Sequence, residues 1–448
     1  MTRTALLISS NSETFPAPVY PLGLARLAGA IEQAGHLAPQ FDPLVHGMAS
    51  LPAVVDQTQP DLVAVSLRNI DNTTSDSRRC YLSEHRGLVE LVRGHTSAPV
   101  AVGGSGFSLF PHPLMQMLGA DYGVVGPGEK AMCALLDGSD PAGVPNLVVR
   151  GDGDADPIRA DDPVAPSSHQ ADLIDYYWRT GGMIGMQTKR GCTRSCSYCT
   201  YPLIDGHVLR HADPEAVADE MERLFRDHGV SFFFIVDSVF NLAPDHEIAF
   251  AEALARRSIP IQWAAFFAPT RSDAAYWRTL KRSGLTHVEF GTDSLCDAML
   301  ASYRKAFTAA DVHRAAALCS ELDLFCAHYL IFGGPDETPE TLRETVAQAE
   351  SLPSCALFPY AGVRIYPRTA LYERALLDGQ VHGDDECLMP KFYLAEGLDA
   401  PSIWELVARH AEGNREWLMP SAMPAREPMM QYLRSQGTKG PLWEFVIK

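Results

Sequence analysis

The sequence lacks a long apolar run. No stretch reaches the roughly 18–20 apolar residues that a membrane-spanning helix needs, and the first residues do not join a basic segment to an apolar core, so neither a membrane span nor a secretory signal is expected. The chain is also short of positive charge, because 37 Lys and Arg face 55 Asp and Glu for a formal net charge of −18. Since binding to nucleic acid requires a basic surface, a nucleic-acid partner is disfavoured.

Ten cysteines are present, which raises the question of a secreted, disulfide-bonded protein. Three of them group within residues 192–199, and the other seven are scattered, several in apolar surroundings (Cys80, Cys133, Cys296, Cys319, Cys326, Cys355 and Cys387). Free buried thiols in a reducing compartment explain the scattered residues best, so a cytoplasmic location is expected.

The grouped cysteines, Cys192, Cys196 and Cys199, form a C-x3-C-x2-C pattern between Gly191 and Pro202. Iron–sulfur clusters are ordinarily held by four cysteine sulfurs, so a short loop with three predicts a [4Fe–4S] cluster with one iron open to another ligand. The alternatives are structural cysteines or a zinc site. Structural zinc favours four ligands, commonly from paired C-x2-C units, and no second C-x2-C unit occurs in the chain.

With the aromatic Tyr198 before its third cysteine, this loop resembles the signature of the radical S-adenosylmethionine (SAM) superfamily. The resemblance implies that the amino and carboxylate groups of SAM bind the open iron. It also implies that an electron from the cluster cleaves SAM to a radical, which removes hydrogen from an unactivated carbon of the substrate. An electron donor such as flavodoxin or ferredoxin is the partner that this chemistry requires.

Residues 1–140 alternate apolar strands with helices. A helix is expected at 22–34, and strands are expected at 5–9, 62–67, 99–104 and 121–126. Continuous apolar strands separated by helices predict a parallel sheet that is covered on both faces. Ligands of such sheets bind at the carboxyl ends of the strands.

Polar and glycine-rich segments follow these strands in an order that resembles the cobalamin (B12)-binding domain preceding the radical SAM domain in one large subgroup. The resemblance implies an α/β, Rossmann-like (flavodoxin-like) fold and a set of cobalamin-binding residues, namely Pro21, Ser66, Leu67, Arg68, Gly103, Gly104, Gly126 and Glu129. Loop 11–21 contains no histidine of the D-x-H-x-x-G kind that ligates cobalt, so Arg68 is expected at the lower face of the corrin without ligating the metal. The alternative is a domain that keeps this fold for substrate or partner binding and holds no cobalamin.

Residues 141–180 are rich in Gly, Pro, Asp and Ser and predict a linker with a solvated acidic loop. From 181 to 365, strand and helix repeat about every 35–40 residues, with strands expected at 183–186, 231–238, 261–266, 286–292 and 326–333. This repetition predicts a partial or complete β/α barrel with its active site at the carboxyl ends of the strands. The superfamily resemblance implies the same fold.

Candidate SAM-binding residues follow these strands. Asp237 and Ser238 follow the strand that begins at Ser231, where a carboxylate can pair with the amino group of SAM. The resemblance implies that Asp293 and Ser294 face the ribose hydroxyls or nearby polar atoms of SAM, and that adenine packs on the turn at Gly333. Arg304 is a candidate for the SAM carboxylate, because a guanidinium fork matches a carboxylate. The alternative for each polar residue is a helix cap or a surface ion pair. No catalytic residue is assigned.

Residues 366–448 predict a small C-terminal helical extension, which either covers the barrel mouth as part of the substrate pocket or only packs against the barrel. The expected function is cobalamin-dependent C-methylation of an unactivated carbon in a small-molecule or peptide substrate. One alternative is a cobalamin-free radical SAM enzyme that performs a rearrangement, a cyclisation or transfer of another SAM fragment. Another is a cobalamin or iron–sulfur sensor without turnover.

Overall fold

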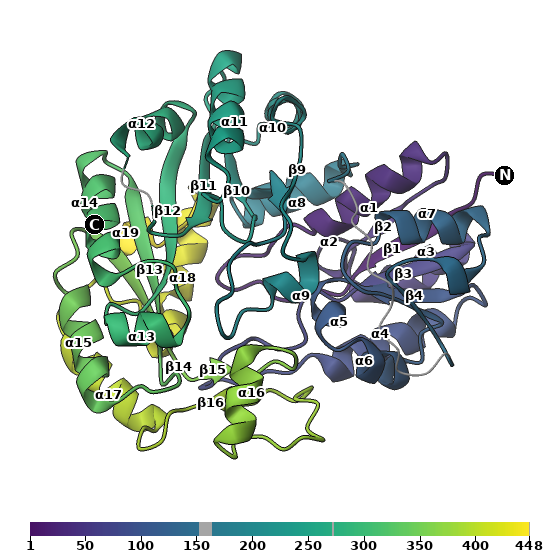
Figure 1. Cartoon of the computed structure of the whole chain (residues 1–448). Coiled ribbons are helices and arrows are strands. Elements are labelled where there is room, and N and C mark those ends of the chain that lie inside the picture. The colour runs from purple at the N-terminus through teal and green to yellow at the C-terminus, as the bar shows by residue number, and fades with distance from the viewer. Residues whose placement is uncertain (152–163, 271–272, 448) are drawn as a thin grey trace.

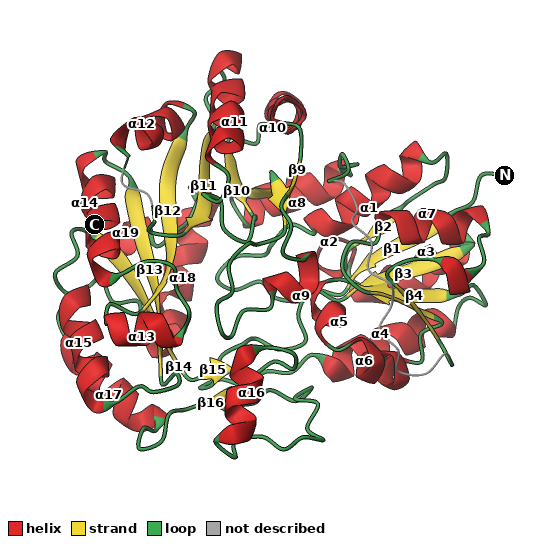
Figure 2. Ribbon diagram, in the orientation of Figure 1, coloured by secondary structure: helices red, strands yellow, loops and turns green. Residues whose placement is uncertain are grey.

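Two α/β lobes make up the protein and lie side by side, with the two chain ends on opposite sides of the view in Figure 1. The computed structural model describes residues 1–151, 164–270 and 273–447. Most of the acidic loop predicted for the linker, residues 152–163, lies outside the described residues. In both lobes a layer of strands is packed against helices (Figure 2).

The first lobe is built on a six-stranded sheet in the order β2-β1-β3-β4-β5-β6. Its first five strands are parallel, and β6 pairs with β5 antiparallel. The order of the five parallel strands is that of a flavodoxin-like sheet, so the predicted fold class of this lobe is confirmed. The strands are β1 (Ala5–Ser9), β2 (Gln40–Phe41), β3 (Leu62–Ser66), β4 (Val100–Gly103), β5 (Tyr122–Val124) and β6 (Leu147–Val149).

Helices cover both faces of this sheet, as the apolar strands predict. On one face, α3, α4 and α6 contribute apolar side chains such as Val55, Val89 and Leu114, and on the other face α1 and α7 contribute Ala28 and Met132. The helices are α1 (Leu22–Gln33), α2 (Pro43–His46), α3 (Leu51–Thr58), α4 (Leu82–Arg93), α5 (Ser105–Leu109), α6 (Pro111–Leu118) and α7 (Glu129–Asp137).

The second lobe contains a six-stranded, wholly parallel sheet in the order β7-β10-β11-β12-β13-β14. Within the described residues its edge strands β7 and β14 do not pair with each other, so the sheet is an open, partial barrel. The predicted partial (β/α) barrel is therefore confirmed. The strands are β7 (Ile184–Met186), β10 (Phe232–Ile235), β11 (Gln262–Phe267), β12 (Leu285–Asp293), β13 (Phe325–Phe332) and β14 (Cys355–Ala361), with a separate β8–β9 ribbon (Lys189–Arg190 and Arg210–His211).

Amphipathic helices pack on the outer face of this sheet and bury outward side chains such as Trp263 and Phe290. At the start of α10, Asp213 accepts a hydrogen bond from the N–H of Glu215 and proline occupies the first helical position. The helices are α8 (Ala171–Thr180), α9 (Tyr201–Asp205), α10 (Pro214–His228), α11 (Pro244–Arg257), α12 (Ala274–Arg282), α13 (Asp297–Ser302), α14 (Ala309–Glu321) and α15 (Pro339–Ala349).

The chain after the barrel forms the small, mostly helical extension that was predicted. Its elements are β15 (Val363–Arg364), α16 (Ala370–Leu377), β16 (Phe392–Tyr393), α17 (Ala400–Ala411), α18 (Met423–Ser435) and α19 (Glu444–Ile447). Next to α19, Trp443 packs into the barrel end where the strands begin, with its ring 5.3 Å from that of His287. The tail thus closes the end opposite the barrel mouth. No helix among the described residues has the length and apolar character needed to cross a membrane.

Candidate active site between the two lobes

The carboxyl ends of both sheets face one cavity of about 860 Å³. In the first lobe, the strand ends Ser9, Ser66 and Gly103 lie next to one another in register and line this cavity. In the second lobe, Tyr329 and Tyr360 line it from the inner face of the barrel. The cavity therefore lies where open α/β sheets and β/α barrels both place their ligands.

Most of the residues predicted to bind cobalamin lie on the wall of this cavity: Pro21, Ser66, Arg68, Gly103, Gly104, Gly126 and Glu129. Leu67 is the exception, because its side chain is fully buried in the core of the first lobe. Its carbonyl oxygen would lie 2.6 Å from a Cβ atom placed on Gly104, which has a φ of +96°. Leu67 therefore shapes the wall through its backbone, and only glycine fits beside it.

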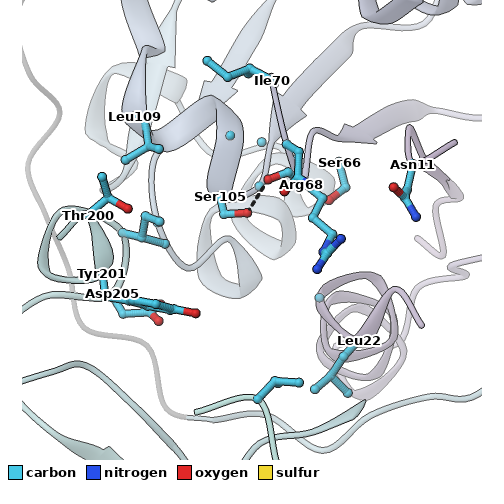
Figure 3. A pocket seen from close by; sticks show the side chains of 18 of the residues that line it. Asn11, Leu22, Ser66, Arg68, Ile70, Ser105, Leu109, Thr200, Tyr201 and Asp205 are labelled. Atoms are coloured by element: carbon cyan, nitrogen blue, oxygen red, sulfur yellow. Dashed lines mark hydrogen bonds between the residues drawn. The ribbon is translucent and has the colours of Figure 1, made fainter. Parts of the chain in front are cut away.

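The side chain of Arg68 extends from the end of β3 into the cavity and points toward Leu22 at the start of α1 (Figure 3). No described residue forms a hydrogen bond or an ion pair with its guanidinium group. Enclosure by the cavity walls lowers the pKa of Arg68, because burial disfavours the charged form. Arg68 thus presents a cation that a ligand in the cavity can contact.

The residues around Arg68 fit cobalamin bound without a histidine ligand from the protein. A Cβ atom on Gly23 would meet no atom within 4 Å, so this glycine leaves open space at the cavity wall beside α1. None of the described residues that line the cavity is a histidine. Arg68 supplies a cation to this wall, and its expected place at the lower face of the corrin stays a prediction.

The three cysteines lie on the loop between β8 and α9, and all three thiols are free. Gly191 opens this loop at a φ of +91°, and a Cβ atom there would overlap the carbonyl oxygen of Val208. Burial raises the pKa of Cys196 and raises that of Cys199 to about 12. Three sulfur donors on one short loop fit a [4Fe–4S] cluster with an open iron.

A histidine pair with H-x3-H spacing, His207 and His211, follows the cysteine loop directly. The ring of His211 packs against that of His246, with a centroid distance of 4.4 Å. Within the described residues, no group of three His, Cys, Asp or Glu side chains is placed to hold a single metal ion. The cluster assignment therefore depends on the spacing of the three cysteines.

Asp237 lies at the end of β10 and is 1% exposed. Its carboxylate accepts hydrogen bonds from the N–H and hydroxyl groups of Thr188 and from the N–H of Lys189, and it forms an ion pair of 2.9 Å with the Lys189 ammonium. All these partners belong to the strand that enters the cysteine loop. The contacts give Asp237 a structural role under the loop, and they leave no free carboxylate oxygen for the amino group of SAM.

Asp293, at the end of β12, lies beside the cysteine loop. Its carboxylate accepts a hydrogen bond from the hydroxyl of Tyr198 and pairs with the ammonium of Lys305. Lys305 also donates to Tyr198 at 3.1 Å and to the carbonyl oxygen of Gly291 at 3.2 Å. Burial opposes the charge on Lys305, but Asp293 and Cys196 outweigh it, so the pKa of Lys305 is raised. The predicted residues Tyr198 and Asp293 are thus brought together.

The remaining predicted strand-end residues do not converge on this network. Ser238 donates to the carbonyl oxygen of Gly191 at 3.0 Å and so stabilises the start of the cysteine loop. Ser294 is fully buried and bonds the hydroxyl of Thr345 at 2.7 Å, away from the cavity. Arg304 is exposed. The predicted ribose contact of Ser294 and carboxylate contact of Arg304 therefore gain no support from these positions.

Comparison with known proteins gives matches over most of the chain. The B12 binding domain matches residues 10–136, and the Radical SAM superfamily matches residues 186–349. The chain therefore contains a radical SAM domain, which lies in its second lobe. Its first lobe is a B12-binding domain, so the predicted cofactors, a [4Fe–4S] cluster, SAM and cobalamin, are confirmed at the level of the two families.

Two curated relatives illustrate the range of this superfamily. Tryptophan 2-C-methyltransferase from Streptomyces laurentii is 28% identical, over 83% of this chain and 74% of that protein. Anaerobic magnesium-protoporphyrin IX monomethyl ester cyclase from Cereibacter sphaeroides is 27% identical, over 73% of this chain and 56% of its own length. Among solved structures, the fold is shared by the radical SAM methyltransferase TsrM from Kitasatospora setae, whose structure contains cobalamin and a [4Fe–4S] cluster. The TM-score is 0.88 and the sequence identity 24%, and the alignment covers 100% of this chain and 98% of that one.

Within this radical SAM fold, the predicted turn at Gly333 is held by Glu337. Gly333 adopts a φ of +87° and donates its N–H to the Glu337 carboxylate. Glu337 is 3% exposed, and within the described residues its Oε1 has no hydrogen-bond partner. Burial raises the pKa of Glu337 to about 7, although the N–H groups of Gly333 and Gly334 act in the opposite direction.

Replacing Glu337 by glutamine is expected to remove a pH dependence of stability. The folded state binds the Glu337 proton more tightly than the unfolded chain does, so this carboxyl group destabilises the wild-type protein progressively as pH rises from about 4.5 to 7. Relative to wild type, the variant should therefore gain at most about 3 kcal/mol between pH 5 and pH 8. Thermal unfolding midpoints at the two pH values measure this change. Glu373→Gln, an exposed change in α16, is the control, and equal pH profiles of wild type and E337Q would contradict the assignment.

Sequence reasoning did not identify Lys305, Arg190 or the start of α9 as parts of the site. Arg190 forms a buried ion pair with Glu129 and so joins the B12-binding lobe to the strand before the cysteines. Thr200 and Tyr201 line the cavity opposite Arg68 (Figure 3). Of these, only Thr200 and Tyr201 carried a signal in the sequence, namely their position directly after Cys199.

Proposed function

We propose that this protein is a cobalamin-dependent radical SAM methyltransferase that transfers a methyl group from SAM to a carbon atom of a small-molecule substrate. The observation that carries the proposal is the single cavity, which joins the strand ends of the B12-binding lobe, the cysteine loop and the inner face of the barrel. When bound, the cluster supplies electrons to SAM and the corrin carries a methyl group. The cavity would hold the corrin on one wall and the cluster with SAM on the facing wall, which favours transfer of a methyl group between them.

In this proposal, residues of the chain hold the cofactors in a fixed relation. Cys192, Cys196 and Cys199 hold the cluster. Arg68 would contact the corrin from the end of β3, and its guanidinium group is not a ligand for cobalt. The ion pair between Glu129 and Arg190 fixes the corrin wall against the strand that leads into the cysteines.

Tyr198, Asp293 and Lys305 form the polar wall next to the open iron in this proposal. The Lys305 ammonium lies close enough to Cys196 for their charges to interact, and Asp293 holds it in place. The three donors of Lys305 are taken by Asp293, Tyr198 and the carbonyl oxygen of Gly291, so in this proposal Lys305 holds Asp293 beside the cysteine loop and does not itself bind SAM. We place the protein in the cytoplasm, where a flavodoxin or a ferredoxin supplies the electron.

The test is anaerobic reconstitution with iron, sulfide and hydroxocobalamin, followed by incubation with a reductant, trideuteromethyl-SAM and candidate substrates. Tryptophan is the first candidate, because it is the substrate named for the Streptomyces laurentii relative. A product that is heavier by one trideuteromethyl group is the expected result. A reconstituted protein with a full cluster and no bound corrin would overturn the proposal.

A second candidate function is cobalamin-free radical chemistry, with cyclisation as one example because a curated relative is named as a cyclase. It predicts 5′-deoxyadenosine formation that is unchanged when cobalamin is omitted. A cobalamin or iron–sulfur sensor predicts instead that SAM is not consumed under any of these conditions. Quantifying 5′-deoxyadenosine and S-adenosylhomocysteine with and without cobalamin distinguishes the methyltransferase, the cobalamin-free radical enzyme and the sensor.

Filling the open space beside α1 is expected to block corrin binding. Gly23→Leu places a side chain where Gly23 now leaves the cavity open, and leucine in a helix is otherwise more favourable than glycine. Corrin content after reconstitution should fall at least about tenfold, while iron content stays at the wild-type level. Gly87→Leu is the matched control, because Gly87 lies in α4, outside the cavity, with equal free space around it. Normal corrin binding by G23L would contradict the placement of the corrin.

A further inference from the structure

The inner face of the barrel carries a set of aromatic rings that the cofactors do not account for. Phe234, Phe266, Tyr329, Phe358 and Tyr360 point inward from β10, β11, β13 and β14 and are half-buried. The Tyr329 ring stacks on Phe358 with a centroid distance of 4.9 Å and lies 6.3 Å from Tyr360 at an interplanar angle of 21°. Phe266 meets the edge of Tyr329 at 5.9 Å.

The outward rings of the same sheet are packed under the helices. Phe233, Phe267 and Phe290 are at most 1% exposed, whereas Tyr329 and Tyr360 reach the cavity between the lobes. Flat aromatic walls favour planar rings, because stacked or edge-to-face pairs add about 0.5–1.5 kcal/mol beyond the burial of their area. The inner face thus favours a planar ring over an aliphatic chain.

A buried carboxylate lies directly behind Tyr329. Glu289, on β12, is 5% exposed and accepts hydrogen bonds from the Tyr329 hydroxyl at 2.7 Å and from the indole N–H of Trp443 at 3.0 Å. Within the described residues, no cation pairs with it. Burial raises the pKa of Glu289, while its two hydrogen bonds act in the opposite direction.

The hydrogen bond from Tyr329 to Glu289 determines whether the Tyr329 oxygen can donate or accept a hydrogen bond in the cavity. A phenol has one proton to donate, and that proton is given to Glu289. The lone pairs of the Tyr329 oxygen are left as hydrogen-bond acceptors, and Trp443 fixes the other carboxylate oxygen so that Glu289 cannot turn away. Tyr329 is therefore set up to accept a hydrogen bond from a substrate N–H or O–H group.

We propose that Tyr329, oriented by Glu289, determines substrate specificity, and that the aromatic chamber takes a planar ring bearing an N–H or O–H donor. The inference rests on the proposed function for the statement that this ligand is the methyl acceptor. Tyr329 contacts the substrate, and Glu289 is a positioning residue that acts through Tyr329. The ring lies between the strand ends of the B12-binding lobe and the inner face of the barrel.

The test measures binding of two matched probes to the reconstituted holoenzyme by anaerobic equilibrium dialysis without SAM, so that no turnover is needed. Indole carries one N–H donor, and 1-methylindole has the same ring without it. The wild-type protein should bind indole about tenfold more tightly, the value of one hydrogen bond to a fixed acceptor. Cyclohexylamine, a cation without an aromatic ring, should bind more weakly than indole.

Three variants separate this role from simple packing. Tyr329→Phe keeps the ring and should reduce the indole to 1-methylindole ratio to about one. Glu289→Gln should reduce the same ratio. The amide N–H can donate to the Tyr329 oxygen, so that Tyr329 donates its own proton into the cavity and no longer accepts from the substrate N–H. Tyr276→Phe removes a similar buried hydrogen bond from a tyrosine to a carboxylate, that of Glu247, outside the cavity, and should leave the ratio unchanged.

A wild-type ratio near one, an unchanged ratio in Y329F, or cyclohexylamine binding as tight as that of indole would overturn the proposal. Corrin and iron contents of each variant establish that it has folded. Ring discrimination without methyl transfer would leave this inference standing and remove the proposed function. Methyl transfer without discrimination between indole and 1-methylindole would overturn this inference and leave the proposed function standing.

Discussion

Replacing Cys196 by alanine is expected to abolish the cluster and all consumption of SAM. A [4Fe–4S] cluster on this loop has only three protein sulfurs, so removing one leaves two ligands for four irons. Iron bound after anaerobic reconstitution should fall from about four per chain to background. Absorbance, iron analysis and 5′-deoxyadenosine formation measure the loss.

The same variant should still bind cobalamin, because the corrin wall is built on the separate sheet of the first lobe. Retained corrin content therefore shows that the protein has folded and that the cluster alone is lost. Cys80→Ala is the matched control, since Cys80 is a half-buried thiol outside the loop. Full iron content in C196A, or zinc in place of iron in the wild-type protein, would contradict the cluster assignment.

The sequence predicted the elements that carry strong local signals. The expected strand at 5–9 is β1, and the expected helix at 22–34 is α1, because its apolar residues repeat with helical spacing and Gly35 follows its end. Buried parallel strands are continuous apolar runs, and such runs stand out from the helices between them. Both lobes were therefore predicted as α/β.

Sequence reasoning missed three of the four edge strands of the two six-stranded sheets, β2, β6 and β14, whereas the edge strand β7 was expected at 183–186. β2 is only two residues long, and β6 pairs antiparallel at the edge of its sheet. β14 contains Pro359, a residue that argues against a central strand and is tolerated here because β14 is an edge strand. The residues of an edge strand carry no pattern that reveals their single pairing partner.

Contacts within the site were harder to predict than its motifs. Cysteine spacing and glycine-rich strand ends are local features of the sequence, and they located both walls of the cavity. Lys305 and Tyr198 lie 107 residues apart and come together only because β12 and the cysteine loop meet in the folded protein. Asp237 was predicted from its strand-end position alone, and that position does not reveal which residues form hydrogen bonds and ion pairs with its carboxylate.

Replacing Lys189 by methionine is expected to be among the most damaging single changes outside the cysteines. Lys189 and Asp237 form a buried ion pair whose side chains are at most 1% exposed. Removing one partner of such a pair leaves an uncompensated buried charge and costs about 3–5 kcal/mol. Hydrogen bonds from Thr188 still stabilise the Asp237 carboxylate, so the lower end of that range is expected.

For a lobe of this size, a loss of about 3 kcal/mol lowers the thermal unfolding midpoint by roughly 6–12 °C. Lys281→Met is the matched control, because Lys281 makes an exposed pair with Asp323 at 3.8 Å, and exposed pairs contribute about 0–1 kcal/mol. Because Lys189 lies three residues before Cys192, K189M should also bind less iron, whereas K281M should not. An unfolding midpoint of K189M equal to that of K281M would show that the pair is not needed to hold the strand entering the cysteine loop.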